Sequence, residues 1–424
     1  MTATDIHRPL EPRDFTTLTL AALGGALEFY DFVIFVFFTT VISQLFFPPE
    51  TPEWLRQAQA FGIFAAGYLA RPLGGIVMAH FGDKQGRKRM FALSIFLMSV
   101  PTLGIGLLPT YAQIGLWAPI ALLALRVLQG AAIGGEVPGA WVFVAEHVPP
   151  RRVGFACGVL TAGLTGGILL GSLVAAAMNR YYSPAEMLDM GWRIPFILGG
   201  LFGLLSVWLR QWLHETPVFR EMEANQSLSA GVPLRTVLRE HRQPLIESML
   251  LSWLLAAAIV VMILMTPTLL QKRFGIGAAD ALFANSLATL SLTVGCILSG
   301  YLVDRWGPGR FFTFGSLLLG GMSVVFYGFF APRPEWLALG YALSGLTVGV
   351  IGAVPCVMVS AFPPAVRFSG LSFAYNLSYA MFGGLTPIIV SLWVAVDIQA
   401  PAYYVAGVSI LGCFLGLRFW RRGQ

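Results

Sequence analysis

Charged side chains are scarce in this chain of 424 residues. Asp, Glu, Lys and Arg together make up 11% of the sequence, whereas they make up about 25% of a typical soluble domain. Hydrophobic residues account for 56%, and the mean hydropathy is +0.73. Because so few charges cannot cover a surface that faces water, the composition excludes an ordinary soluble protein and predicts a membrane protein.

Cysteine is scarce as well. The four residues, Cys157, Cys296, Cys356 and Cys413, lie in separate apolar runs, and no C-x-x-C pair occurs. This spacing supports neither a disulfide framework nor a metal site, so we expect buried free thiols. The sequence also lacks a Walker lysine and a nucleophile–base pair, and we expect neither a cofactor nor an enzyme.

The sequence shows no cleavable signal peptide and no lipidation motif. Its net charge of +6 raises the question of nucleic-acid binding. The arginines form no basic stripe, since they lie in short loops between apolar runs, and we therefore expect no nucleic-acid partner.

The chain contains twelve apolar runs, and each is long enough to cross a bilayer as a helix. They lack the alternation of apolar and polar residues that a membrane β-barrel requires. The predicted fold class is an all-α polytopic membrane protein with twelve transmembrane helices in two six-helix pseudo-repeat bundles. The predicted spans are 17–46, 57–81, 91–109, 115–145, 154–178, 192–213, 244–271, 279–303, 311–331, 335–361, 368–396 and 401–420.

Basic residues are distributed unevenly between the loops. With both termini placed in the cytoplasm, 19 of the 27 Lys and Arg residues lie in inside segments and 6 lie in outside loops. The remaining two, Arg71 and Arg126, lie within spans. Positive charge collects on the cytoplasmic side of membrane proteins, so this bias predicts that both termini are cytoplasmic.

One polar stretch, 214–243, is longer than any other loop and divides the spans into two sets of six. We predict an N-terminal six-helix bundle at 1–213, a cytoplasmic linker at 214–243 and a C-terminal six-helix bundle at 244–424. The two sets are related, because a loop motif recurs 221 positions later in degraded form. Repeats of this kind place the substrate site of many transporters near the bilayer midplane. The matching residues are Asp83, Gly86 and Arg89 in the first copy and Asp304, Gly307 and Arg310 in the second.

The first copy of this motif, G-D-x-x-G-R-K-R at residues 82–89, resembles the signature of the major facilitator superfamily. Other segments narrow the resemblance to the metabolite:proton symporter branch, which takes up citrate, 2-oxoglutarate, shikimate, proline or betaine. The resemblance implies a proton-coupled symporter that imports a small organic acid or related metabolite by alternating access, in the bacterial inner membrane. These segments are residues 27–32, 71–74, 126–130, 134–136, 191–196, 215–217, 366–370, 375–376 and 401–404.

Five ionisable residues lie deep in the predicted spans, where a charge costs about 3 kcal/mol and is by default a candidate for function. Glu28 and Asp31 are three residues apart on one helix face, and two close carboxylates favour the binding of a proton. We predict that Asp31, with Glu28 and Glu136, carries the coupled proton. The alternative for Glu28 and Asp31 is a permanent ion pair with Arg71 or Arg126, which would hold the helices in register. The alternative for Glu136 is a structural role as a partner for the basic loops.

The two intramembrane arginines, Arg71 and Arg126, are the predicted receptors for a substrate carboxylate. A guanidinium keeps its charge when buried and binds a carboxylate with two parallel hydrogen bonds. For Arg126, neutralisation of a nearby acid is an equally open alternative. Polar side chains complete the predicted substrate site, with interhelical hydrogen bonding as their alternative. They are Tyr30, Tyr375, Asn376 and Tyr379.

We expect the motif loops to act as a cytoplasmic gate. Their acidic and basic residues can pair across the ends of helices and with a helix terminus while the transporter faces outward. The alternative is that basic residues only anchor the loops at the membrane surface. The predicted gate residues are Gly82, Asp83, Gly86, Arg87, Arg89, Asp304 and Arg310.

Two other functions remain open. One is a proton-driven antiporter that exports a drug or metabolite, although residues 163–167 lack the proline of the G-P-x-x-G-G element that such exporters often carry. The other is a receptor that binds its substrate without transport, for which the linker offers no signalling module. For the leading function, the partners are protons, the lipid bilayer and a small substrate with a carboxylate, and we expect a monomer.

Overall fold

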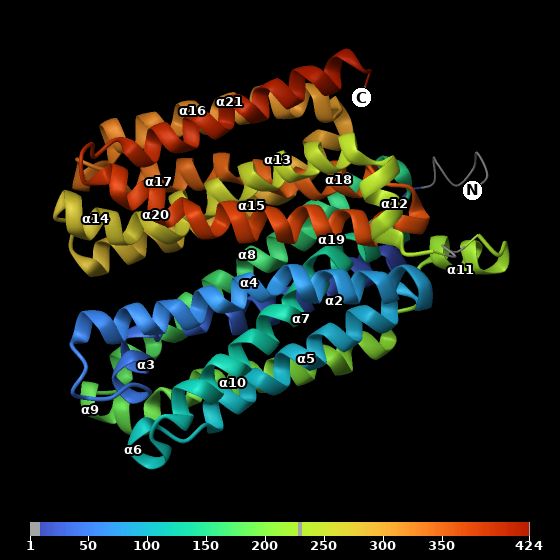
Figure 1. Ribbon diagram of the computed structural model, residues 1–424. Coiled ribbons are helices and arrows are strands. Elements are labelled where there is room, and N and C mark those ends of the chain that lie inside the picture. Colours follow the sequence, from blue (N-terminus) through green and yellow to red (C-terminus); the bar gives the residue numbers. More distant parts are fainter. Residues whose placement is uncertain (1–8, 228–230, 424) are drawn as a thin grey trace.

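The computed structural model describes residues 9–227 and 231–423, apart from the side chains of Glu28, Gln57, Ala58, Phe61, Arg210 and Ala278. Long helices run side by side in two bundles, which we call the N-half and the C-half (Figure 1). The chain enters the first long helix and leaves the last one at the same end of the molecule, which we call the terminal end. We call the opposite end the far end.

The N-half is built from long helices with short connections. Helix α3 (Thr39–Leu45) continues α2 after a break at Phe38, and α6 (Tyr111–Ile114) and α9 (Pro184–Glu186) are short helices in loops. The long helices are α2 (Pro12–Phe37), α4 (Glu53–Gln85), α5 (Arg87–Leu107), α7 (Trp117–His147), α8 (Val153–Tyr181) and α10 (Arg193–Leu209).

The C-half has the same organisation, but irregular turns divide several of its spans. Between the halves, the linker forms α11 (Pro217–Ala224) and α12 (Pro233–Glu240). The helices of the C-half are α13 (Arg242–Ile259), α14 (Thr266–Phe274), α15 (Ala278–Trp306), α16 (Pro308–Val325), α17 (Pro334–Val348), α18 (Val354–Ser360), α19 (Arg367–Ser378), α20 (Gly384–Val394) and α21 (Ala400–Arg421).

The structure confirms the all-α fold class. Eleven helical stretches are long and apolar enough to cross a membrane, and the number is twelve if Pro184–Gly191 and Arg193–Leu209, which meet at 42°, form one span. No β-strand occurs in the described part of the chain. The predicted spans agree with the observed helices apart from their ends, the break at Phe38 and the two linker helices.

The two motif loops form the same tight turn in each half. Gly86, between α4 and α5, has a backbone φ of 114°, and Gly307, between α15 and α16, has a φ of 80°. Residues with a Cβ rarely adopt such angles, so glycine is required at both positions. Each turn follows a helix whose last turn carries an aspartate, Asp83 in α4 and Asp304 in α15.

Prolines explain where C-half helices depart from regular α geometry. Proline has no amide hydrogen, so the carbonyl group four residues earlier loses its partner. A π-helical turn at Val260–Met265 precedes Pro267, and another at Tyr379–Gly383 precedes Pro387. The second turn begins at one of the predicted substrate-site residues.

The halves meet mainly along two helix pairs, α4 with α19 and α8 with α15, and α7 also contacts α19. Small residues let the second pair approach closely, since a Cβ on Gly158 would lie 2.6 Å from the carbonyl oxygen of Cys296 and 3.0 Å from Cα of Gly300. This kind of packing is typical of helices in membranes. Both pairs join a helix of one half to a helix of the other, as the pseudo-repeat implies.

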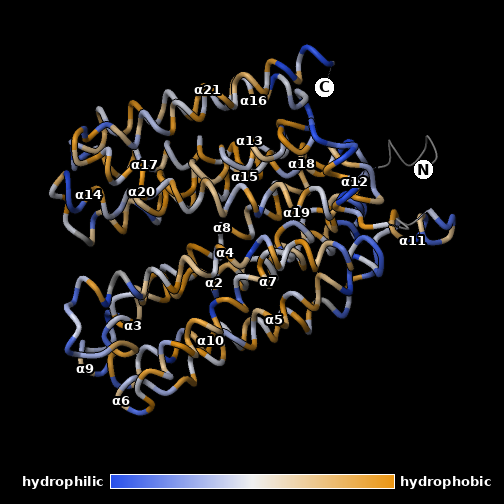
Figure 2. Tube along the Cα trace, viewed as in Figure 1, coloured by the Kyte–Doolittle hydropathy of each residue, from blue (hydrophilic) through white to orange (hydrophobic). Residues whose placement is uncertain are grey.

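Apolar side chains cover the outside of both bundles. Figure 2 shows hydrophobic residues along the helices and hydrophilic residues gathered at their ends. Leu73, Leu392 and Phe414 are 65–70% exposed on α4, α20 and α21. Such an exposed apolar surface has no counterpart on a soluble monomer, so these side chains face lipid.

The contact of α4 with α7 depends on Gly130, whose Cα lies against the backbone of Gly67. We predict that Gly130→Ala destabilises the protein by about 1–3 kcal/mol, because the added methyl group meets the Gly67 carbonyl and forces the helices apart. Thermal unfolding of the detergent-purified protein measures this effect. Gly166→Ala is the matched control, since a Cβ there meets no atom within 4 Å and alanine is the better helix former. Equal melting temperatures for the two variants would contradict the prediction.

Candidate functional site

Arg71 lies between the halves, in the middle of α4. Its guanidinium carbon is 5.5 Å from the ring centre of Tyr68, 5.2 Å from that of Tyr375 and 4.7 Å from that of Tyr379. Tyr68 belongs to α4, whereas the other two rings belong to the C-half. Arg71 is only 2% exposed, so side chains of both halves enclose its charge.

Arg126 on α7 has a similar environment within the N-half. Its guanidinium carbon lies 4.3 Å from the ring centre of Phe35 and 5.2 Å from those of Phe32 and Phe64. Arg126 is fully buried. Its Nη1 donates a 2.8 Å hydrogen bond to Oε1 of Gln129.

A continuous set of rings joins the two arginines. Tyr68 packs edge-on against Phe32 and Phe64, and it stacks on Tyr379 with the ring centres 6.4 Å apart. The faces of aromatic rings stabilise a nearby cation without neutralising it. We call this set the aromatic cluster; it consists of Phe32, Phe35, Phe64, Tyr68, Tyr375 and Tyr379.

Neither arginine has an anionic partner among the described side chains. Arg71 and Arg126 form no described ion pair, and Nε and Nη2 of both lack a hydrogen-bond partner. The alternative in which an arginine forms an ion pair with Asp31 or Glu136 is therefore not observed. The side chain of Glu28, the third acid of that alternative, lies outside the described residues. Two buried guanidinium groups with free donors can bind an anion.

Asp31, the predicted proton carrier, is buried inside the N-half, where its Oδ1 lies against Gly199 on α10. A Cβ on Gly199 would also be 3.1 Å from Cγ2 of Thr102. Gln129 connects this region to the arginine, because it donates a 2.6 Å hydrogen bond to Oγ1 of Thr102 and accepts one from Arg126. Hydrogen bonds therefore lead from Arg126 through Gln129 to Thr102, whose methyl group lies beside the same glycine as Asp31.

Glu136, the second predicted proton carrier that the structure describes, is buried on α7. It forms no ion pair with any described residue, and the buried arginines of the basic loops bind other acids instead. The structural alternative of a partner for those loops is therefore not realised, and a part in proton transfer stays a prediction.

Two predicted substrate ligands make other contacts. Tyr30 is fully buried inside the N-half, where its hydroxyl donates a 3.0 Å hydrogen bond to the carbonyl oxygen of Pro195. Nδ2 of Asn376 donates to the carbonyl oxygens of Gly134 and Ser372 at 2.6 and 2.9 Å. Tyr30 therefore ties α2 to α10, and Nδ2 of Asn376 ties α19 to α7, whereas Oδ1 of Asn376 has no described hydrogen-bond partner. A substrate contact of either residue stays a prediction.

At the terminal end, Asp83 connects the halves. Its two oxygens accept hydrogen bonds from the backbone amides of Phe368 and Ser369 at 3.3 and 2.9 Å, at the N-terminus of α19. A carboxylate at this position complements the partial positive charge of the helix end. Arg87 forms a 3.0 Å ion pair with Asp83 and donates a 2.7 Å hydrogen bond to the carbonyl oxygen of Pro364 in the C-half.

Glu146, at the end of α7, provides a second connection. Its Oε1 pairs with Arg367 of the C-half at 3.0 Å. Its Oε2 lies 3.5 Å from Nε of Arg87 and accepts a 2.7 Å hydrogen bond from the hydroxyl of Thr216. One buried carboxylate thus bridges arginines of both halves. We call Asp83, Arg87, Glu146, Arg367 and the N-terminus of α19 the closing contact.

The pseudo-repeat places a matching aspartate at the other helix pair. Asp304 accepts hydrogen bonds from the backbone amides of Gly154 and Phe155 at 2.7 and 2.8 Å, at the N-terminus of α8. Each half therefore holds the first turn of a helix of the other half with an aspartate from its own motif loop.

The remaining gate residues differ in what they do. Gly82 leaves room for the ring of Phe368, which lies against it from the C-half. Arg89 and Arg310 take no part in the contact between halves, contrary to our expectation. Arg89 is exposed, and Arg310 lies 5.4 Å from the ring centre of Trp420 within the C-half.

Sequence reasoning missed Glu146 and the contribution of Glu215. Glu215 accepts hydrogen bonds from the backbone amides of Arg87 and Lys88, both at 3.1 Å, and so caps α5. A signal was available for both, because each acid ends an apolar run next to a basic loop. Which basic loop each acid contacts depends on the folding of segments that lie far apart in the chain.

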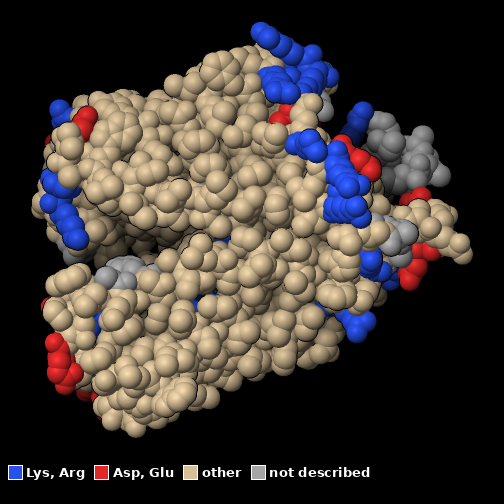
Figure 3. All heavy atoms as spheres, viewed as in Figure 1, with Lys and Arg blue, Asp and Glu red and all other residues tan. Residues whose placement is uncertain are grey.

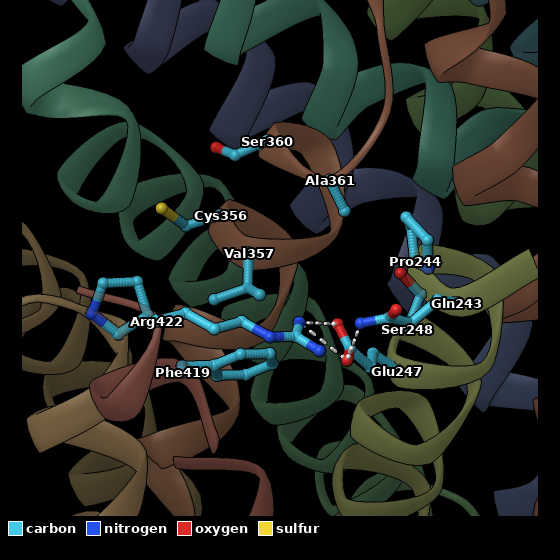
Figure 4. Close-up of a pocket in the computed structure, with 11 residues that line it drawn as sticks. Gln243, Pro244, Glu247, Ser248, Cys356, Val357, Ser360, Ala361, Phe419 and Arg422 are labelled. Atoms are coloured by element: carbon cyan, nitrogen blue, oxygen red, sulfur yellow. Dashed lines mark hydrogen bonds and ion pairs between the residues drawn. The ribbon is translucent and has the colours of Figure 1, made fainter. Parts of the chain in front are cut away.

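The two ends of the molecule differ. Figure 3 shows a hollow between the halves at the far end, whereas the terminal end, which carries the closing contact, is closed. A separate pocket of about 430 Å³ lies within the C-half at the terminal end (Figure 4). There Glu247 binds Arg418 at 3.2 Å and Arg422 at 2.9 Å, so its charged residues already have partners.

Comparison with known proteins identifies the class of protein that this fold and these contacts define. The model of the Major Facilitator Superfamily matches residues 21–364. The chain therefore belongs to the Major Facilitator Superfamily of membrane transporters.

Relatives and solved structures narrow the comparison. The proline/betaine transporter of Escherichia coli K12 is 30% identical over 441 residues, covering 97% of this chain and 86% of the relative. The glycine betaine/proline/ectoine/pipecolic acid transporter OusA of Dickeya dadantii is 31% identical over 427 residues, covering 94% and 82%. The structure of the proton:xylose symporter XylE has a TM-score of 0.80 at 16% identity and covers 96% of this chain and 95% of its own, which shows a common fold.

Glu146→Gln tests the closing contact. Loss of the carboxylate leaves two arginines without their anion, which costs the closed arrangement about 3–5 kcal/mol, so we expect the terminal end to open. Cys157, which is fully buried on α8 beside the interface, reports the opening. In a chain whose other three cysteines are alanine, we expect a thiol reagent to modify Cys157 faster in the variant.

Glu247→Gln is the matched control for this prediction. Glu247 also binds two arginines at the terminal end, but all three residues belong to the C-half. If Glu247→Gln accelerates the modification of Cys157 as much as Glu146→Gln does, the closing contact is not what holds the halves together.

Proposed function

We propose that this protein is a proton-coupled symporter that imports a small zwitterionic metabolite of the proline or betaine type by alternating access. The observation that carries the proposal is the pair of buried arginines, Arg71 and Arg126, which lie in the aromatic cluster without a described carboxylate partner. The names of the relatives support the substrate type. The substrate class that we predicted, a small organic acid or related metabolite, is thereby restricted to carboxylates that also carry a cationic nitrogen.

The chemistry of such a substrate matches the arginines and the rings. A carboxylate can accept two parallel hydrogen bonds from the guanidinium of Arg71, whose Nε and Nη2 have no described partner. Aromatic faces attract substituted ammonium groups, which proline and betaine carry. One site can therefore bind both charges of a zwitterion.

Access to Arg71 depends on the relative position of the halves. Two of its three neighbouring rings, Tyr375 and Tyr379, belong to the C-half, and Tyr379 begins a π-helical turn. Because the rings cover the arginine in this conformation, the substrate reaches it only when they move away. Movement of one half against the other does this and so links binding to alternating access.

Asp31 is the proposed proton carrier. When Asp31 is deprotonated, its charge competes with a substrate carboxylate for an arginine. Hydrogen bonds that join Arg126 to Gln129 and Thr102, beside the glycine that Asp31 faces, support an influence of Asp31 on Arg126. Protonation removes this competition, so proton and substrate favour the same state of the transporter. Glu136 is the second candidate for the same task.

The closing contact is the proposed cytoplasmic gate. Figure 3 shows Lys and Arg side chains gathered at the terminal end, which supports a cytoplasmic position for that end and for both termini. The proposed location is the bacterial inner membrane, and the proposed divisions of the chain stay at 1–213, 214–243 and 244–424. In this orientation the structure is closed towards the cytoplasm and faces outward.

Transport by the purified protein in liposomes tests the proposal. With protons in excess outside, we expect uptake of labelled proline or betaine together with acidification of the interior, and little uptake of citrate, 2-oxoglutarate or shikimate. Efflux of the solute driven by entering protons would support the antiporter instead. Binding without flux would support the receptor.

Asp31→Asn is expected to abolish accumulation, because asparagine cannot bind and release a proton. One charge that crosses 100 mV contributes about 2.3 kcal/mol, so the wild-type protein can accumulate substrate roughly fifty-fold and the variant only to equilibrium. Exchange of labelled for unlabelled substrate should persist, since it needs no net proton transfer. Full accumulation by Asp31→Asn would reject Asp31, and loss of accumulation in Glu136→Gln alone would assign the proton to Glu136.

Arg71→Lys is expected to raise the substrate concentration needed for half-maximal uptake about tenfold, because lysine keeps the charge but loses the two-pronged hydrogen bond. Arg193→Lys is the control, since Nη1 of Arg193 donates to the carbonyl oxygens of Gly106 and Leu108 outside the aromatic cluster. An unchanged affinity in Arg71→Lys would remove Arg71 from the substrate site.

A further inference from the structure

Three arginines converge on a hollow of about 270 Å³ beside the interface of the halves at the terminal end. Arg151 and Arg152 come from the turn that precedes α8 in the N-half, and Arg305 comes from the last turn of α15 in the C-half. Tyr301 and Asp304, also on α15, complete the lining. We call these five residues the arginine hollow.

The charges of the arginine hollow are not balanced. Its one carboxylate, Asp304, already accepts the two backbone hydrogen bonds at the N-terminus of α8. Arg305 donates a 3.2 Å hydrogen bond to the hydroxyl of Tyr301, whereas the side chains of Arg151 and Arg152 form no hydrogen bond or ion pair with a described residue. Three cations from two halves thus face a hollow that holds a single carboxylate, so positive charge is in excess.

The matching site in the other copy of the repeat shows that the fold does not require an excess of positive charge at this position. At the closing contact, Arg87 and Glu146 are buried and neutralise charges beside the matching aspartate, Asp83. The offset of 221 residues puts Pro308 at the position of Arg87. Where Pro149-Pro150 matches Pro363-Pro364 after the fourth helix of each half, Ser360 takes the position of Glu146. The first interface therefore has paired acids and bases, whereas the second lacks one base and one acid and keeps only its aspartate, Asp304.

We propose that the arginine hollow binds the phosphate of an anionic phospholipid headgroup. Guanidinium groups bind phosphate oxygens in pairs, and basic residues at the ends of transmembrane helices attract anionic lipids. The position supports a lipid as the source of the phosphate. Tyr301 and Trp306 are 40% and 47% exposed at the end of the membrane-spanning α15, and exposed aromatic residues of this kind mark the headgroup level.

A phosphate bound in the arginine hollow stabilises the contact between the halves. Its arginines come from both halves, so one phosphate contacts all three only while the terminal end is closed. A ligand that binds one conformation shifts the population towards it. Anionic lipid therefore favours the conformation closed at the terminal end, and this effect is independent of which substrate the protein carries.

Native mass spectrometry of the detergent-purified protein with phosphatidylglycerol or phosphatidylcholine tests the proposal. The variant R151Q/R152Q/R305Q removes the cations of the hollow. The matched control R235Q/R239Q/R242Q removes three arginines in and beside α12, also at the terminal end. We expect the wild type and the control to retain phosphatidylglycerol selectively, and the hollow variant to bind it at least about tenfold more weakly.

Each other outcome overturns the proposal. Equal retention by the wild type and the hollow variant means that the lipid binds elsewhere, and equal losses in both variants mean only a general attraction to basic ends. Inorganic phosphate, tested by thermal shift, distinguishes the source, since stabilisation by it without selective lipid retention assigns the hollow to a soluble anion. If the triple variant does not fold, R152Q/R305Q, with one arginine from each half, replaces it under the same criteria.

A conformational measurement completes the test. Phosphatidylglycerol should slow the modification of buried Cys157 in the wild type and the control but not in the hollow variant. Only the first two proteins keep the arginines through which the lipid would stabilise the closed terminal end. If the lipid slows modification equally in all three proteins, it acts through the bilayer and not through the arginine hollow.

Discussion

The cost of burying a charge away from water is the constraint on which this structure depends. A buried ion loses several kcal/mol of hydration unless other groups replace it. At the terminal end, Asp83 and Glu146 meet this requirement with backbone amides at a helix end and with arginines of both halves. These partners come from opposite halves, so the contact exists only while the halves meet. For Arg71 and Arg126, the faces of aromatic rings replace only part of the lost hydration. These two guanidinium groups can therefore still bind an anion.

The same turn and aspartate cap occur once in each half, but the charged residues around them differ. In both halves a glycine with positive φ follows an aspartate that holds the first turn of a helix in the other half. Around the first copy, acids and bases balance and are buried. Around the second copy, Pro308 and Ser360 replace two of the charged residues, and three arginines remain open to the surroundings. The backbone of the repeat is therefore shared, whereas the charges around it make one copy the closing contact and the other the arginine hollow.

Sequence patterns predicted the helices well because hydropathy is a local property of about twenty residues, and the bilayer imposes it on every span. They also predicted Arg71 and Arg126 as unusual, because an arginine within an apolar run is visible without a fold. They did not reveal the hydrogen bonds that Tyr30 and Asn376 form between helices, since neighbouring residues on a helix point in directions about 100° apart and only packing decides which direction meets the other half. Glu146 was missed because its partners, Arg87 and Arg367, lie far from it in the chain.

The amino-acid sequence by itself determined the membrane environment, the number of spans, the pairing of two related halves and the presence of charged residues within the spans. Each of these follows from composition, periodicity or spacing along one stretch of chain. Only the tertiary structure decided which charges are paired. It surrounded Arg71 with rings from both halves, turned Asp31 towards α10, and set three arginines around one hollow. The physical reason is that electrostatic and aromatic contacts depend on distances of a few ångströms between segments that are remote in sequence, and these distances exist only after the helices pack.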